Sequence, residues 1–334
     1  MERAGTFSMI DEYQRQIDYL RISVTDRCNL RCQYCMPEEG VPLVNHDEIL
    51  RYQEILRLVQ VFAGLGIQKI KLTGGEPLVR RQLPDLAGEI RKIPGIHQVT
   101  LTTNGVLLKE QMRDLAKAGI DGINLSLDTL DGEEYQRITR RAELSRVWEG
   151  FLEALKYPQV TLKINCVPMS QSRESLLQVA RLSKDYPVHV RFIEMMPIGL
   201  GADWEGYRES KIYRILRGAF GEGEPVKETL GNGPAHYVQF DGFQGKIGFI
   251  SAVSHKFCDQ CNRVRLTAQG YLKTCLQYDR GVDLRELLRR GATDRELAEQ
   301  IAQALLEKPE GHAFYEKKEK GEDTEKKMMS QIGG

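Results

Sequence analysis

Short apolar stretches alternate with longer amphipathic stretches over residues 18–194. Six of the short stretches have the length and the alternating polarity of β-strands, and the stretches between them have the length and periodicity of helices. The predicted strands are YLRISVT (19–25), QKIKLT (68–73), QVTLTT (98–103), GINLSLD (122–128), VTLKINC (160–166) and VHVRFIE (188–194). This repetition predicts an α/β protein with a parallel sheet and right-handed crossovers. Six strand–helix units instead of eight predict a partial (β/α)6 barrel of the TIM type.

Each predicted strand has one apolar face and one polar face. Fully buried parallel strands are usually apolar on both faces, so the polar face needs an explanation. If the helices pack on the apolar face, the polar face must line the inside of the barrel. That face carries Arg21, Lys69, Lys71, Thr102, Asn124, Ser126, Lys163, Asn165 and Arg191. We therefore predict a lumen that holds a polar ligand.

The strand–helix alternation ends near residue 195. Loop-rich segments follow, then short predicted strands around HYVQF (236–240) and GKIGFI (245–250), and amphipathic helices near 282–290 and 294–307. The mixed-charge run EKKEKGEDTEKK is typical of a flexible linker. We expect three parts, namely a barrel core over 1–195, a C-terminal α+β region over 196–315 and a flexible charged tail over 316–334.

The composition narrows the classes of function. Hydrophobic residues make up 41% of the 334 residues, which is enough for a globular core. Lys plus Arg and Asp plus Glu number 47 each, so no net charge attracts nucleic acid or an anionic membrane. The chain has no apolar run of membrane-spanning length, and its N-terminus lacks a signal-peptide core. We expect a cytoplasmic protein that binds neither nucleic acid nor membrane.

Six of the seven cysteines form two triads: Cys28, Cys32 and Cys35, and then Cys258, Cys261 and Cys275. In a reducing compartment this clustering favours metal binding over disulfides. Each triad is one ligand short of the four that iron–sulfur clusters and structural zinc sites usually have. The seventh cysteine, Cys166, falls on an apolar strand face, where we expect it to act as a small hydrophobic residue.

A structural zinc site with a distant histidine is the alternative for each triad. His46 is the candidate ligand for the first triad, and His255 or His236 for the second. The first triad lacks the matching second pair of ligands that zinc sites usually have. The second triad is followed by NRVRLT, in which Arg263 and Arg265 lie on one face. Two arginines there would favour thiolates and would also suit a phosphate-bearing ligand.

The spacing CxxxCxxC, with Tyr34 before the last cysteine, is similar to the signature of radical S-adenosylmethionine (SAM) enzymes. In that superfamily three cysteines hold a 4Fe–4S cluster, and the open fourth iron binds SAM. TGGEP (73–77), after the second predicted strand, resembles the glycine-rich turn that meets the SAM amino group. The resemblance implies SAM contacts at Tyr34, Gly75, Ser126 and Met196.

Over nearly its whole length the chain resembles the GTP 3′,8-cyclase family, which begins molybdenum cofactor biosynthesis. The matching segments are DYLRISVTDRCNLRCQYCMP, KLTGGEPLVR, LTTNG, INLSLD, RFIEMMP, the second triad and the terminal Gly-Gly. The resemblance implies a lyase that uses SAM and two 4Fe–4S clusters, of which the second meets the guanine of GTP. A SAM-derived radical would take the hydrogen from C3′ of GTP. The C3′ radical would then attack C8, and reduction would give 3′,8-cyclo-7,8-dihydro-GTP.

The same resemblance implies roles for single residues. The GTP contacts would be Arg21, Lys71, Thr102, Lys163, Arg191, Arg263 and Arg265. The catalytic residues would be Arg263 and Arg265, together with the terminal Gly333 and Gly334, which in the family reach into the active site. Burial of a triphosphate, with about four negative charges, independently requires several cations. The family usually has arginine in place of Lys71, and lysine cannot bind phosphate in the planar bidentate manner of arginine.

The implied partners are GTP, SAM, an electron donor and cyclic pyranopterin monophosphate synthase as the next enzyme, with the protein a monomer or a homodimer. A different radical SAM enzyme with an auxiliary cluster, such as a peptide-modifying enzyme, would explain both triads but neither the cations nor the terminal Gly-Gly. A non-enzymatic zinc or electron-transfer protein would leave TGGEP and the polar lumen without a role. We therefore expect a GTP cyclase.

Overall fold

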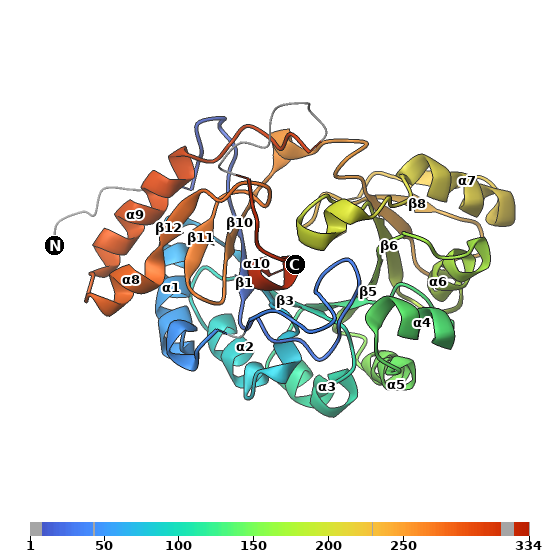
Figure 1. Ribbon diagram of the computed structural model, residues 1–334, viewed down its shortest axis with the longest axis horizontal. Coiled ribbons are helices and arrows are strands. Elements are labelled where there is room, and N and C mark those ends of the chain that lie inside the picture. Colours follow the sequence, from blue (N-terminus) through green and yellow to red (C-terminus); the bar gives the residue numbers. More distant parts are fainter. Residues whose placement is uncertain (1–8, 43, 229, 315–323, 334) are drawn as a thin grey trace.

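The computed structural model describes residues 9–42, 44–228, 230–314 and 324–333. Within these residues the strands form one sheet of 12 strands in the order β12-β11-β10-β1-β2-β3-β4-β5-β6-β9-β8-β7. Its centre consists of β1 (Tyr19–Ser23), β2 (Lys69–Thr73), β3 (Gln98–Thr103), β4 (Gly122–Ser126), β5 (Thr161–Cys166) and β6 (His189–Ile193). Each of these strands pairs in parallel with the next one. The six predicted strands are confirmed, and the α/β sheet curves without closing (Figure 1).

Strands from the C-terminal region extend the same sheet at both edges. β10 (Arg263–Leu266) pairs in parallel with β1, and antiparallel β11 (Tyr271–Lys273) and β12 (Gly281–Asp283) follow it. At the other edge β9 (Ile247–Ile250) pairs in parallel with β6, and antiparallel β8 (His236–Gln239) and β7 (Glu224–Val226) follow. The C-terminal region therefore continues the sheet of the barrel core on both sides.

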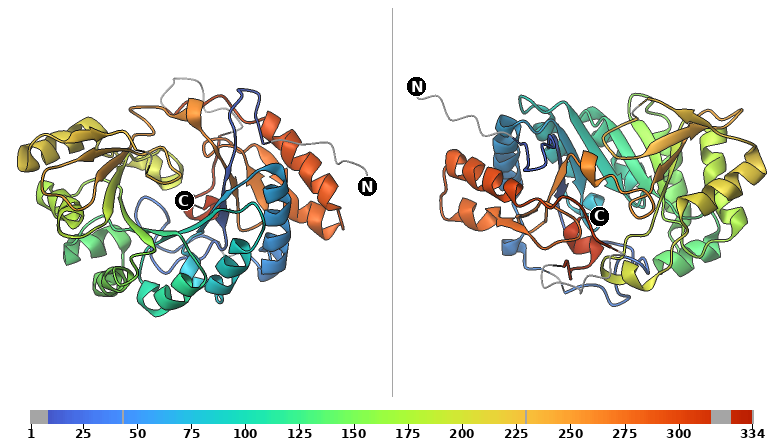
Figure 2. Two further views of the ribbon diagram at one scale, coloured as in Figure 1. Left: turned by 180° about the vertical axis from the view of Figure 1, so that it is seen from behind. Right: turned by 90° about the horizontal axis from the view of Figure 1, so that it is seen from above.

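Most helices lie on the outer side of the curved sheet (Figures 1 and 2). They are α1 (Tyr52–Leu65), α2 (Leu83–Arg91), α3 (Leu108–Lys117), α4 (Gly132–Thr139), α5 (Leu144–Ala154), α6 (Arg173–Asp185), α7 (Glu209–Phe220), α8 (Leu284–Arg289) and α9 (Asp294–Leu306). Only the short α10 (Met329–Ile332) lies on the inner side among the described helices. Single 3-10 turns are η1 (His46–Glu48), η2 (Pro77–Val79), η3 (Gly199–Asp203) and η4 (Cys258–Gln260).

The main core lies between the outer face of the sheet and the helices. Ile22, Leu72 and Leu101 on the strands are fully buried, as is Phe62 on α1. Cys166 belongs to this core, as the sequence predicts. Local signals fix the ends of the helices: Gly66 follows α1 with a left-handed φ of 112°, and Thr293 begins α9 in a reciprocal capping box. No helix among the described residues has both the length and the apolar character needed to cross a membrane.

Candidate active site

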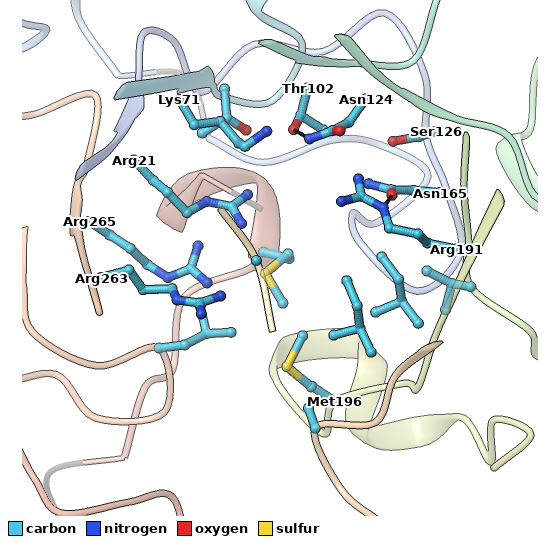
Figure 3. A pocket seen from close by; sticks show the side chains of 18 of the residues that line it. Arg21, Lys71, Thr102, Asn124, Ser126, Asn165, Arg191, Met196, Arg263 and Arg265 are labelled. Carbon is cyan, nitrogen blue, oxygen red and sulfur yellow. Dashed lines mark hydrogen bonds between the residues drawn. The ribbon is translucent and has the colours of Figure 1, made fainter. Parts of the chain in front are cut away.

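A cavity of about 630 Å³ lies on the inner face of the sheet. The inward side chains of the central strands line it, as the alternating pattern predicts (Figure 3): Arg21, Lys71, Thr102, Asn124, Ser126, Lys163, Asn165 and Arg191. Lys69 was expected on this face but is not part of the lining. Its Nζ forms an ion pair with Asp18 Oδ2 at 2.6 Å, next to the beginning of β1. On β2 the lining of the cavity therefore begins at Lys71 and not at Lys69.

Strand register arranges the cations of the cavity in rows. Arg265 on β10 is paired with Arg21 on β1, and Arg21 with Lys71 on β2. Neighbouring strands lie about 5 Å apart, so these three side chains form one continuous wall. Figure 3 shows Arg21, Arg263 and Arg265 together on one side of the cavity and Arg191 on the other. The Nε of Arg191 donates to Asn165 Oδ1 at 2.9 Å.

Crowding of like charges makes the cavity electropositive. Burial, followed by repulsion from Arg21 and Arg191, holds the pKa of Lys71 well below its ordinary value. Burial and then Arg191 lower the pKa of Lys163 to about 8. Burial, Arg21 and Arg263 likewise lower the pKa of Arg265 to about 9. Such a group of buried cations is stabilised by an anionic ligand.

The acidic residues that line the cavity are engaged in other hydrogen bonds. Glu76 accepts from the Thr103 hydroxyl at 2.7 Å and from the Leu78 amide at 2.9 Å. Burial raises the pKa of Glu76 to about 7. Glu194 accepts from the amide of Ser254 at 2.8 Å. The hydrogen bonds of Glu76 and Glu194 hold loops around the cavity in place. We therefore expect a negatively charged ligand to balance the charge of the cations.

The loop after β1 presents the first cysteine triad to the cavity. A tight turn forms there, in which the amides of Cys35 and Met36 both donate to the carbonyl of Cys32 at 2.9 and 3.0 Å. Burial raises the pKa of Cys28 to about 11 and that of Cys35 to about 12. These buried groups are therefore neutral thiols in the free protein, and a metal that bound them would displace their protons.

The glycines of TGGEP pack against the start of the cysteine loop. A Cβ on Gly74 would lie 2.5 Å from the Thr25 carbonyl oxygen, and one on Gly75 would lie 2.4 Å from that of Arg27. The Gly75 amide also donates to the Thr25 carbonyl at 2.7 Å. Only glycine fits these positions, because any side chain would collide with backbone. The turn after β2 thus holds the cysteine loop in addition to lining the cavity.

The four residues that the resemblance assigns to SAM line the same cavity as the first triad. Tyr34, Gly75, Ser126 and Met196 all line it, although they come from four different segments. The hydroxyl of Tyr34 donates to Asp128 Oδ2 at 2.9 Å, which fixes the ring beside the triad. Burial raises the pKa of Asp128 to about 6.

The second cysteine triad also lines the cavity. Cys258 belongs to η4, Cys261 directly follows it, and Cys275 follows β11. Lys308, which is buried, donates from Nζ to Cys261 Sγ at 3.5 Å and to the Thr274 carbonyl at 2.5 Å. Burial alone would raise the pKa of Cys261, but Lys308 and Arg263 outweigh it, and the net shift is downward. A buried cation is therefore placed where it stabilises a thiolate.

Arg15 fixes the same region from the N-terminal side. Its guanidinium forms a buried ion pair with Asp11 at 2.6 Å and donates to the Cys258 carbonyl at 2.7 Å. It also donates to the carbonyls of Pro309 and Glu310 at 2.7 and 2.6 Å. The second triad is thus held between the N-terminal segment and the chain that follows α9.

The three histidines considered above as zinc ligands do not lie at the cysteine triads. His236 and His255 both face Glu209, at 2.9 and 3.4 Å, and do not line the cavity. His46 is an exposed residue of η1. In the described part of the chain, no three His, Cys, Asp or Glu side chains converge closely enough to share one metal ion. In an iron–sulfur cluster each thiolate binds a different iron, so the thiols of a triad need not converge on one ion.

The C-terminus enters the cavity between the cations and the first triad. The carbonyl of Gly333 accepts from Arg265 Nη1 at 3.2 Å, and Met329 and Ser330 of α10 line the cavity. Gly333 has a left-handed φ of 86°, and a Cβ on it would lie 2.7 Å from Cβ of Ser23. Gly334, which the resemblance also makes catalytic, lies outside the described residues.

Sequence reasoning missed several residues of the site. Lys308 and Arg15 read as ordinary surface cations, because nothing in the local pattern marks them as buried. The segment 230–234 also lines the cavity, where the Leu230 carbonyl accepts from Lys163 Nζ at 2.6 Å. Its composition, LGNGP, predicts only a loop.

Two family models match the chain in succession. The radical SAM superfamily matches residues 22–182, and Molybdenum Cofactor Synthesis C matches residues 188–314. GTP 3′,8-cyclase of Clostridium perfringens (strain 13 / Type A) is 44% identical over 327 residues, which cover 98% of this chain and all of the relative. GTP 3′,8-cyclase of Pelotomaculum thermopropionicum is 44% identical over 330 residues with the same coverage.

Solved structures with the same fold include Streptococcus suis SuiB. It has a TM-score of 0.61 and 15% identity, with 88% of this chain and 66% of that chain covered. The form bound to S-adenosylmethionine has a TM-score of 0.59 and 15% identity, with 81% and 65% covered. At 15% sequence identity, this similarity shows a shared fold only. The shared fold agrees with the open sheet described above.

Proposed function

Because the chain belongs to the GTP 3′,8-cyclase family of the radical SAM superfamily, we propose that the cavity inside its curved sheet is its active site. The protein is a lyase that cyclises GTP by radical SAM chemistry in molybdenum cofactor biosynthesis, with SAM and iron–sulfur clusters as cofactors. The product is 3′,8-cyclo-7,8-dihydro-GTP. The proposal concerns which residues of this chain bind each component.

The observation that carries the proposal is the group of buried cations that shares one cavity with both cysteine triads. A GTP triphosphate brings about four negative charges, which offset the repulsion among these cations. We assign its binding to Arg21, Lys71, Lys163, Arg191, Arg263 and Arg265. Thr102, whose hydroxyl accepts from Asn124 Nδ2 at 3.4 Å, is assigned to the nucleoside part of GTP.

The first triad is assigned to the cluster that binds SAM. When bound, that cluster supplies the electron that cleaves SAM. Cys28, Cys32 and Cys35 would hold it, and Tyr34, Gly75, Ser126 and Met196 would orient SAM. The reaction removes hydrogen from C3′ of GTP and joins C3′ to C8. The ribose must therefore be held against SAM and the purine against the ribose, which is a task of positioning and exclusion of water.

The second triad is assigned to a 4Fe–4S cluster near the guanine of GTP. Three buried or half-buried thiols face the cavity, and Lys308 donates to one of them. We assign catalytic positions to Arg263 and Arg265, because both belong to β10, which begins two residues after Cys261 and pairs with β1, and both line the cavity. Gly333 accepts from Arg265, and we also assign a catalytic role to Gly334, which lies outside the described residues.

The reaction also needs partners beyond GTP and SAM. An electron donor must reduce the first cluster, and cyclic pyranopterin monophosphate synthase would take up the cyclised nucleotide. We place the reaction in the cytoplasm, because clusters held by thiolates suit a reducing compartment. The protein would act as a monomer or a homodimer.

An anaerobic assay with GTP, SAM and a low-potential reductant tests the proposal. We expect the formation of 3′,8-cyclo-7,8-dihydro-GTP and 5′-deoxyadenosine. Arg263→Ala should lower kcat/KM by about a hundredfold, the scale of a lost charge-assisted phosphate contact in a buried site. Arg217→Ala, a change at an exposed position of α7, is the matched control. Cleavage of SAM without any consumption of GTP would rule out the substrate assignment.

A further inference from the structure

The C-terminal segment (324–333) is attached to the sheet well before it reaches the cavity. Lys273 on β11 is completely buried, and its Nζ forms an ion pair with the buried carboxylate of Glu325. The same Nζ donates to the Tyr278 carbonyl at 2.7 Å and to Asp279 Oδ1 at 3.3 Å. The amide of Glu325 in turn donates to the Gln277 carbonyl at 2.7 Å. Neither Lys273 nor Glu325 lines the cavity.

From Glu325 the segment runs into the active site and ends there. Met328 packs against η3, where a Cβ on Gly199 would lie 3.2 Å from Met328 Sδ. The amide of Ser330 in α10 donates to the sulfur of Cys35, a cysteine of the first triad. The carbonyl of Gly333 then accepts from Arg265. Figure 1 shows α10 on the inner side of the sheet, near β1 and β10.

α10 cannot hold this position through its own helical structure. It has four residues, a single turn, and a turn of that length is unstable in isolation. Its place must come from tertiary contacts. Among the contacts of the described segment, the pair of Lys273 and Glu325 is the one in which both charged side chains are buried. A buried charge that loses its partner is strongly unfavourable, so the pair resists separation.

We propose that Lys273 and Glu325 form a latch outside the cavity that positions the C-terminal segment for catalysis. The latch sets where α10 meets Cys35 and where Gly333 meets Arg265. Lys273 and Glu325 are positioning residues, since neither reaches the cavity. The consequence for turnover rests on the proposed function, whereas the placement of the segment can be measured without GTP or SAM.

Hydrogen exchange followed by mass spectrometry, on the anaerobic holoprotein, tests the placement. Glu325→Gln keeps the shape of the side chain and removes its charge. We expect the amides of 327–333 to exchange about tenfold faster or more, with the central strands unchanged. Lys326→Gln removes a charge from the exposed neighbouring residue and should exchange like the wild type. If the amides of 327–333 exchange at the wild-type rate in Glu325→Gln, the latch is wrong. It is also wrong if the amides of the whole sheet exchange faster by the same factor as those of 327–333.

Two further readouts connect the latch with catalysis. In Glu325→Gln we expect kcat for GTP to fall about tenfold with little change in KM. We also expect an altered electron paramagnetic resonance signal of the reduced first cluster, because Cys35 loses the Ser330 amide. Wild-type kcat in a variant whose segment exchanges faster would overturn the positioning role. If the wild type itself fails to convert GTP, the proposed function is wrong, and the exchange result still decides whether the latch exists.

A double variant separates the latch from general stability. Lys273→Met alone leaves the Glu325 carboxylate buried without its cation and should free the segment. Lys273→Met combined with Glu325→Met replaces the pair by apolar side chains, which often pack as well as a buried ion pair. We expect the double variant to recover much of the slow exchange of 327–333. If the effects of the two single substitutions on the exchange of 327–333 simply add in the double variant, the two residues act independently. That result would overturn the proposal.

Discussion

At the scale of single residues, the function depends on cations whose charge is costly to bury. Lys163 illustrates this, since burial and Arg191 lower its pKa to about 8 in the free protein. Lys71 is affected in the same direction, first by burial and then by its cationic neighbours. A bound triphosphate would offset the repulsion among these cations, and both lysines would then be fully protonated. An arginine in place of Lys71 would stay charged over a wider range of pH.

This leads to a prediction about pH. As the pH rises through about 8, the free protein loses the proton of Lys163, and GTP binding must then take a proton up. We therefore expect affinity for GTP to fall by about tenfold between pH 7.5 and 9, a range above the phosphate pKa of about 6. Calorimetry in two buffers of different ionisation enthalpy would measure both the affinity and the proton uptake.

The control for this prediction is Lys163→Gln, which carries no charge at any pH. It should bind GTP more weakly, and its affinity should depend less on pH over the same range. An affinity of the wild type that is independent of pH, without proton uptake, would show that Lys163 keeps its proton in the free protein.

At the scale of elements, the site depends on where strands and turns meet. Register between β10 and β1 places Arg265 opposite Arg21, so a strand from the C-terminal region completes the row of cations. The turn after β2 fits against the cysteine loop because Gly74 and Gly75 lack side chains. α10 approaches β1 in the same way, since Gly333 combines a φ of 86° with close contact to Ser23. Small residues at these positions bring whole elements within bonding distance of one another.

Substitution of Gly333 tests the last of these contacts. Gly333→Ala adds a methyl group 2.7 Å from Cβ of Ser23, a strand atom that cannot move away. We expect kcat to fall about tenfold or more while iron content is unchanged, because displacement of α10 costs positioning and not cluster binding. Deletion of both Gly333 and Gly334 should nearly abolish cyclisation.

Gly291→Ala is a matched control for this substitution. Gly291 has a left-handed φ of 84° as well, but a Cβ there meets nothing within 4 Å. It should lower the unfolding temperature slightly through backbone strain and leave turnover unchanged. If Gly333→Ala behaves in the same way, close approach to Ser23 does not matter for catalysis.

At the scale of the whole molecule, one curved sheet brings both cysteine triads to one cavity. The first triad follows β1, and the second flanks β10 and β11, which are the next two strands beside β1 in the sheet. The segment after α9 and the N-terminal segment hold the second triad through Lys308 and Arg15. Radical chemistry needs such an arrangement, because SAM and GTP must react out of contact with water.

Metal analysis of the anaerobically reconstituted protein tests this arrangement. We expect about eight irons and eight sulfides per chain with little zinc, four of each for every 4Fe–4S cluster. About four irons with one zinc would make the second triad a structural zinc site and remove its proposed role at GTP.

Because a cluster with an open iron is readily oxidised, protein isolated in air should be inactive, and full activity after isolation in air would contradict the cluster assignment.

The six central strands, their polar inner face and the two cysteine triads can be predicted from the order of the amino acids. These features are local: alternation with a period of two fixes which side chains share a strand face, and the spacing of cysteines fixes which thiols share a loop. Three other features become visible only in the folded chain: β9 and β10 extend the sheet, Lys69 forms an ion pair with Asp18, and Lys273 and Lys308 are buried. Burial and pairing of such lysines depend on segments far apart in the chain, and the local pattern around a buried lysine does not differ from that around an exposed one.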